Sequence, residues 1–122
     1  MIRAIRNLTR NQVLAQRVRL CKSCWSRLKG LLGTTGLGQD EACWIDSCNA
    51  IHTFGMRYPL DVYFLDKKNT VVAILKNLEP NRISPFFPAA CSVLEFQSGF
   101  ARECHIGDRL DPEVSSEALV SH

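Results

Sequence analysis

The chain has 122 residues, 46% of them apolar and 22% charged, which is the size and composition of one globular domain. It holds no apolar run long enough to span a membrane, and arginines interrupt the start, where a signal peptide needs its apolar segment. Residues 1–39 carry eight basic and no acidic residues, whereas residues 40–122 carry seven basic and twelve acidic ones. We therefore expect one soluble, cytoplasmic domain over residues 1–122, with a basic front third and no membrane span.

The first predicted elements are a strand and a short helix. Residues 12–20 alternate in character, with Arg17 and Arg19 on one side and apolar residues on the other, as in a β-strand. The period then changes to that of an amphipathic helix between Ser23, a suitable N-cap, and Gly33, a suitable C-terminal residue. The front of the chain is thus predicted to be one strand followed by one short α-helix.

The rest of the chain is predicted to form short strands. Alternating or continuous apolar residues predict strands over 42–46, 60–66, 70–76 and 91–97. The polar run at 66–69 predicts a hairpin turn, three prolines between 80 and 88 predict a long loop, and the polar residues 111–122 predict a flexible tail. These elements favour a mainly β fold with one short helix, either an antiparallel distorted sandwich of jelly-roll type or a partial barrel.

The segment CNAIHTFGMRYPLDVYFLD at 48–66 concentrates side chains that can do chemistry. Cys48, His52 and Met56 share a face on an extended strand, and their sulfur and nitrogen atoms suit a soft metal. The pattern supplies no fourth ligand, so we assign neither a metal nor a cofactor. A nucleophilic Cys48 with His52 as its base requires a sharp turn, because four residues of strand span about 13 Å.

Asp61 lies one residue into an apolar strand, where a buried carboxylate needs a partner or backbone donors. Arg57 is the predicted partner, and the pair would clamp the loop 53–59 onto the strand. The alternative is an acid–base role together with His52. The candidate binding residues are therefore Cys48, His52, Met56, Arg57 and Asp61, and no catalytic residue is assigned.

The six cysteines are too few for a disulfide scaffold and are expected to be thiols. Cys21 and Cys24 have the spacing of a redox motif or of half a zinc site, at the start of the predicted helix. However, no βαβ pattern surrounds them, and no second closely spaced Cys/His pair follows. We interpret these cysteines as incidental.

Five segments form a recognisable series: RLKGLLG at 27–33, WIDSCNAIHTFGMRYPLDVYFLD at 44–66, VVAILKNLEP at 71–80, VLEFQSG at 93–99 and GDRL at 107–110. Over about residues 12–110 they resemble, in order and spacing, the family called Domain of Unknown Function 192. The most specific part is Met56, Arg57, Pro59-Leu60-Asp61 and Phe64, although many relatives carry Trp where this chain has Gly55. The resemblance implies a jelly-roll-like or sandwich-like β fold with a short helix, and it implies no assigned activity.

The first functional interpretation is a non-catalytic ligand-binding or accessory module, because β-sandwiches often present ligand-binding faces. Its expected cleft, for a small molecule, is floored by the loop 48–59 and walled by the strand of Asp61. One alternative is a hydrolase-like enzyme that uses His52 with Asp61 or Cys48. A second is nucleic-acid or anionic-surface binding by residues 1–39, which is disfavoured because their basic residues are spread out with one aromatic residue among them. No oligomeric state is predicted.

Overall fold

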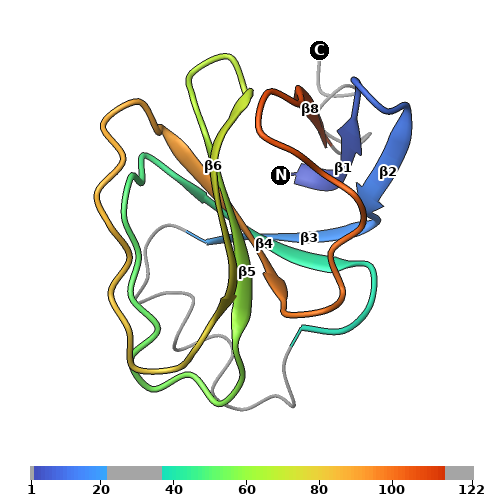
Figure 1. Cartoon of the computed structure of the whole chain (residues 1–122). Helices are drawn as coiled ribbons and strands as arrows, with labels where there is room; N and C mark the ends of the chain where they lie inside the picture. Colours follow the sequence, from blue (N-terminus) through green and yellow to red (C-terminus); the bar gives the residue numbers. More distant parts are fainter. Residues whose placement is uncertain (1, 22–36, 115–122) are drawn as a thin grey trace.

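The computed structural model describes residues 2–21 and 37–114, and within them it holds eight β-strands and no helix. The strands are β1 (Ile2–Asn7), β2 (Gln12–Ala15), β3 (Arg17–Cys21), β4 (Glu41–Asp46), β5 (Leu60–Leu65), β6 (Val71–Leu78), β7 (Ser92–Gln97) and β8 (Leu110–Val114) (Figure 1). The predicted mainly β fold is confirmed. The predicted helix over residues 23–33 lies outside the described residues.

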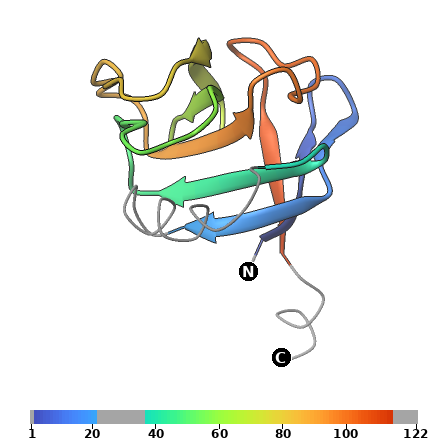
Figure 2. The ribbon, with the colours of Figure 1, turned by 90° about the horizontal axis from the view of Figure 1, so that it is seen from below.

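The strands form two sheets. The larger has the order β3-β4-β7-β5-β6, in which β3 and β4 are parallel and the other neighbours antiparallel. The smaller has the antiparallel order β2-β1-β8 and lies at one side of the larger sheet (Figure 2). Among the described strands neither sheet closes into a barrel.

The predicted strand over residues 12–20 is in fact two strands that belong to different sheets. The chain changes sheet at Gln16, where the backbone nitrogens of Gln16 and Arg17 both donate to the carbonyl oxygen of Asp40, at 3.1 and 3.0 Å. Alternation of apolar and polar residues shows an extended backbone but not its partner, so it does not reveal the break.

The predicted tail over residues 111–122 is wrong for its first part, because β8 runs from Leu110 to Val114. This strand pairs antiparallel with β1, and its first residue, Leu110, is buried. The polar sequence DPEV gives no strand signal of its own, so it is the long-range pairing with β1 that makes it a strand.

The predicted hairpin is confirmed as β5 and β6. Asp66 forms the turn, because its Oδ1 accepts hydrogen bonds from the backbone nitrogens of Lys68 and Thr70, at 2.8 and 3.0 Å. Asn69 adopts the left-handed conformation, with a φ of 62°, that asparagine tolerates better than most residues. The turn chemistry is local, which is why the sequence shows it.

Strand β5 is buried along its whole length because both faces of the larger sheet are covered. On one face, Leu60, Val62 and Phe64 share an apolar cluster with Ile51 and Met56 from the loop that precedes the strand. On the other face, apolar residues of the two sheets meet in a second cluster that includes Tyr63, Leu65, Ile5, Leu14 and Leu110. The loop 48–59 therefore covers one face of β5, and the smaller sheet covers the other.

Candidate ligand-binding sites

The loop 48–59 is fixed to the loop 79–84 through Thr53, which is 0% exposed. The Thr53 hydroxyl donates to the carbonyl oxygen of Glu79 at 2.6 Å and accepts from the backbone nitrogen of Arg82 at 2.9 Å. His52 forms an isolated β-bridge with Ile83, so the two loops run side by side (Figure 1). Sequence reasoning missed Thr53, because its partners lie more than twenty residues away.

Cys48, His52 and Met56 each make contacts that need no metal ion. Met56 is 7% exposed and belongs to the core, and Cys48 packs against that core while its thiol donates to the carbonyl oxygen of Ala50 at 3.1 Å. The ring of His52 stacks on Phe54 with centroids 4.9 Å apart. Within residues 2–21 and 37–114, no three His, Cys, Asp or Glu side chains are arranged to hold a metal ion.

Asp61 is 3% exposed and joins the ends of three strands. Its oxygens accept hydrogen bonds from the backbone nitrogens of Asn77 and Gly99, at 2.9 and 3.2 Å, and from the hydroxyl of Ser98 at 3.2 Å. Among the described cations, Lys76 pairs with it at 3.5 Å. The predicted partner Arg57 is exposed, and among the described residues it makes no ion pair with Asp61.

Lys76 connects Asp61 to an open groove along β6. Burial would lower the pKa of Lys76, but its 2.9 Å hydrogen bond to the hydroxyl of Tyr63 and the charge of Asp61 raise that pKa above its usual value. The groove measures about 400 Å³ and is lined by residues 74–79, Arg82 and Ile83. Because a lysine on an edge strand also discourages pairing with other chains, the position of Lys76 has a structural explanation without a ligand.

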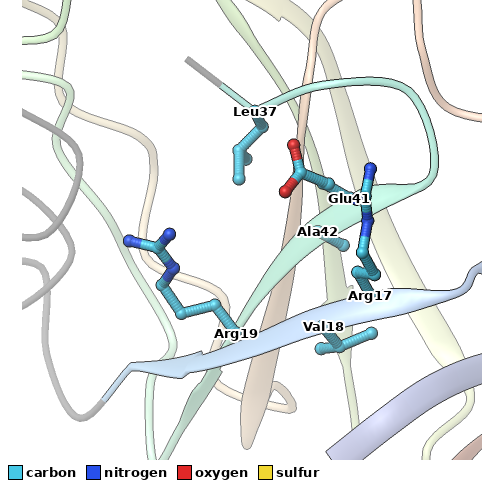
Figure 3. Close-up of a pocket in the computed structure, with 6 residues that line it drawn as sticks. All are labelled: Arg17, Val18, Arg19, Leu37, Glu41 and Ala42. Atoms are coloured by element: carbon cyan, nitrogen blue, oxygen red, sulfur yellow. The ribbon is translucent and has the colours of Figure 1, made fainter. Parts of the chain in front are cut away.

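A second hollow, which we call the arginine pocket, lies where β3 pairs with β4 (Figure 3). Arg17 and Arg19 alternate with Val18 along β3, and their side chains extend to the same side (Figure 3). The pocket measures about 310 Å³. The described residues that line it are Arg17, Val18, Arg19, Leu37, Glu41 and Ala42.

The described acidic residues near Arg17 do not form an ion pair with its guanidinium. Asp40, the acidic residue in an adjoining hollow, pairs with Arg102 at 2.6 Å. Glu41 accepts a hydrogen bond from the backbone nitrogen of Gly38 at 2.6 Å. In the described part of the chain no acidic side chain forms an ion pair with Arg17. The guanidinium of Arg17 thus lines the hollow without an acidic partner among the described residues.

Other arginines of the basic front third are paired. Arg6 lies 3.4 Å from Glu113, and Arg10 lies 2.7 Å from Asp108 and 3.2 Å from Glu103. The acidic partners come from the far end of the chain, so their proximity is invisible in the sequence. These pairs reduce the positive charge that the front third presents to solvent.

Two further buried carboxylates were missed by sequence reasoning. Asp108 is 3% exposed and accepts hydrogen bonds from the side chains of Asn7 and Arg10 and from the backbone nitrogen of His105. Glu95 is fully buried in β7. It lies two residues from Val93, so the two side chains share one face of the strand. The sequence does indicate a buried Glu95, because it is the one acidic residue within the apolar run SVLEFQ. Asp108 follows a glycine in a turn, and nothing in the sequence there indicates a buried carboxylate.

The buried thiol of Cys104 should be chemically inert. Burial, followed by the charge of Asp108, raises its pKa to about 12. Cys91 is exposed, so iodoacetamide at pH 8 should alkylate Cys91 at least about a hundredfold faster than Cys104 in the native protein. Peptide mass spectrometry over a time course measures both rates, and unfolding in urea should make them similar. Equal native rates would contradict the assigned burial.

Comparison with known proteins places the chain in a family. The family model of Domain of Unknown Function 192 (DUF192), described as "Uncharacterized ACR", matches residues 5–112. The chain belongs to this family. The DUF192 match confirms the resemblance seen in the sequence and extends it into β1 and β8.

Two solved structures share the fold of this DUF192 protein. A protein of unknown function from Novosphingobium aromaticivorans is 22% identical, with a TM-score of 0.70, over 88% of this chain and 81% of its own. A "putative transcription regulator" from Sinorhizobium meliloti is also 22% identical, with a TM-score of 0.65, over 89% of this chain and 90% of its own. No curated protein matches the chain. At these identities the likeness concerns the fold alone.

The structure adds one fact about membranes. No helix in the described ranges is long and apolar enough to cross a bilayer.

Proposed function

We propose that this DUF192 protein is a non-catalytic binding module that takes a small organic anion in the arginine pocket. The observation that carries the proposal is the guanidinium of Arg17, which lines the pocket and pairs with no described acidic side chain. Guanidinium groups bind carboxylate and phosphate oxygens in a bidentate manner. The aliphatic stems of Arg17 and Arg19 add apolar surface for the organic part of the ligand.

The binding role is favoured over catalysis because the candidate catalytic groups are otherwise engaged. Asp61 is surrounded by the donors of Asn77, Ser98 and Gly99, and the thiol of Cys48 donates within its own loop. Among the described residues that line the arginine pocket, only Glu41 can act as an acid or base near neutral pH. A hydrolase needs a nucleophile or an activated water as well as that base.

A small ligand is also favoured over an extended anionic surface. Nucleic acid and anionic membranes are bound by many unpaired cations acting together. In the described part of the front third, Arg6 and Arg10 are neutralised by acidic partners, whereas Arg17 lies in a local hollow. The geometry therefore supports one small anion more than a broad charged surface.

Replacing Arg17 with glutamine should weaken binding of a small organic anion about fivefold, because one partly exposed charge contact is lost. The measurement is a titration of the full chain with butyrate and with propyl phosphate at constant ionic strength, followed by ¹H–¹⁵N NMR. In the unaltered protein, the backbone signals of residues 17–19, 38 and 41–42 should shift with a common dissociation constant.

Arg109→Gln is the matched control, since Arg109 is an exposed arginine outside the pocket and should leave the dissociation constant unchanged. Arg57→Gln tests the site expected from the sequence. If the anions shift residues 52–61 instead, and Arg57→Gln removes that response, the ligand belongs to the loop 48–59 and the arginine pocket is the wrong site. Absence of any saturable shift would also overturn the proposal.

A further inference from the structure

We infer that the ligand of the arginine pocket is a zwitterion that carries an ammonium group as well as a carboxylate, an inference that rests on the proposed function. The pocket presents two kinds of charge: the guanidiniums of Arg17 and Arg19 and the carboxylate of Glu41. All three side chains extend toward the hollow from two adjacent strands (Figure 3). A simple anion would meet Glu41 as a repulsive neighbour, whereas an aminocarboxylate would pair with both signs.

The parallel pairing of β3 and β4 sets the spacing of these charges. Arg17 is the register partner of Glu41, so their backbones are about 4.8 Å apart. Arg19 lies two residues further along, about 6.6 Å from Arg17 at the backbone. Arg17 and Glu41 therefore stand side by side without forming an ion pair with each other. This separation suits a short ligand with an anionic and a cationic end.

Glu41 is held in place by the turn that precedes it. Its Oε1 accepts the hydrogen bond from the nitrogen of Gly38, and its own backbone nitrogen donates to the carbonyl oxygen of Gly38 at 3.2 Å. A carboxylate has two oxygens that accept hydrogen bonds, so the bond from Gly38 leaves acceptor capacity for a ligand. These two hydrogen bonds therefore hold the carboxylate of Glu41 at the pocket and leave it able to accept a hydrogen bond from a ligand.

Gly38 has a steric role in this arrangement. A Cβ atom at position 38 would lie 2.8 Å from Oε1 of Glu41, so the carboxylate would have to move. The displaced atom is the tip of a flexible side chain, and the backbone of Gly38 is outside the left-handed region. Gly38→Ala should therefore displace the charge of Glu41 with little loss of stability.

The size of the pocket agrees with a ligand of a few heavy atoms. A space of about 310 Å³ lies at the lower end of the range of small-molecule sites. The aliphatic stems of Arg17 and Arg19 border it, which favours a short aliphatic link between ammonium and carboxylate. The class of ligand is thus a small aliphatic aminocarboxylate.

Three probes of matched size test the inference: butyrate, n-butylamine and 4-aminobutyrate, each titrated into the full chain and followed by NMR. In the unaltered protein, 4-aminobutyrate should bind about two- to fivefold more tightly than butyrate. Glu41→Gln keeps an oxygen for the nitrogen of Gly38 and removes the charge, so it should abolish this advantage while butyrate binds at least as well. Gly38→Ala should likewise reduce the advantage.

The outcomes separate the inference from the proposed function. If butyrate binds in the pocket but 4-aminobutyrate gains nothing, or if Glu41→Gln leaves the ratio unchanged, the zwitterion is wrong and the anion site stands. If butylamine binds as tightly as 4-aminobutyrate and Arg17→Gln has no effect, the pocket selects cations and both proposals fail. If none of the three shifts the pocket signals, both fail as well.

Discussion

Replacing Asp61 with alanine should lower the free energy of unfolding by about 3 kcal/mol, because several buried donors lose their acceptor at once. The backbone nitrogens of Asn77 and Gly99 and the hydroxyl of Ser98 all donate to this one carboxylate. The substitution would release the ends of β5 and β6 and the turn after β7 from one another. Urea denaturation followed by tryptophan fluorescence measures the change.

The control for this prediction is Arg57→Ala, because Arg57 was the partner expected from the sequence. Arg57 is exposed, so its removal should change the free energy of unfolding by less than about 0.5 kcal/mol. Asp61→Asn should be intermediate, since the amide oxygen still accepts from Asn77 while the amino group faces other donors. If Arg57→Ala destabilises the protein as much as Asp61→Ala, the ion-pair clamp was the correct interpretation after all.

At Asp61 the sequence predicted the burial of the side chain but not its hydrogen-bond partners. Its burial was predictable, because the apolar neighbours Leu60 and Val62 fix it inside a strand. Its partners were not, since Lys76 and Ser98 reach it only through the antiparallel pairing of β5 with β6 and β7. Arg57 was chosen because it is near in sequence, and proximity along the chain is a poor guide in a sheet built mostly from long-range pairs.

The arginine pocket illustrates the same limit. The alternation of Arg17 and Arg19 on one side of a strand was predicted correctly, because the side-chain period of a strand is two. The position of Glu41 opposite Arg17 could not be, because it depends on the parallel pairing of β3 with β4. The division of residues 12–20 between two sheets was hidden for the same reason. A sequence pattern thus indicates which residues share a face but not what that face meets.

Asp108 should make the protein more sensitive to acid than its composition suggests. Burial alone would raise the pKa of Asp108, but hydrogen bonds from Asn7, from the backbone of His105 and from Arg10 hold it below the usual value of 3.8. A carboxylate whose pKa is lowered by folding stabilises the native state above its unfolded pKa. That contribution is lost as the pH falls below about 3.8 through the folded pKa.

Asp108→Asn should therefore cost about 2 kcal/mol of unfolding free energy at pH 7, and this cost should shrink as the pH falls below about 3.8. Around Asp108, Arg10 stays charged, the thiol of Cys104 stays neutral with a pKa of about 12, and Glu103 pairs with both Arg10 and His105. Urea denaturation of both proteins between pH 7 and 3 measures the difference.

Glu79→Gln is the control for the loss of stability at low pH. Glu79 pairs with Arg82 at the surface, where both side chains are more than half exposed. A surface pair of this kind contributes little, so the pH profile of that variant should follow the unaltered protein. If the curves of Asp108→Asn and the unaltered protein stay parallel down to pH 3, the carboxylate does not gain its stability from being ionised. The acid sensitivity would then belong to another group, and the contacts of Asn7 and Arg10 would act through shape rather than charge.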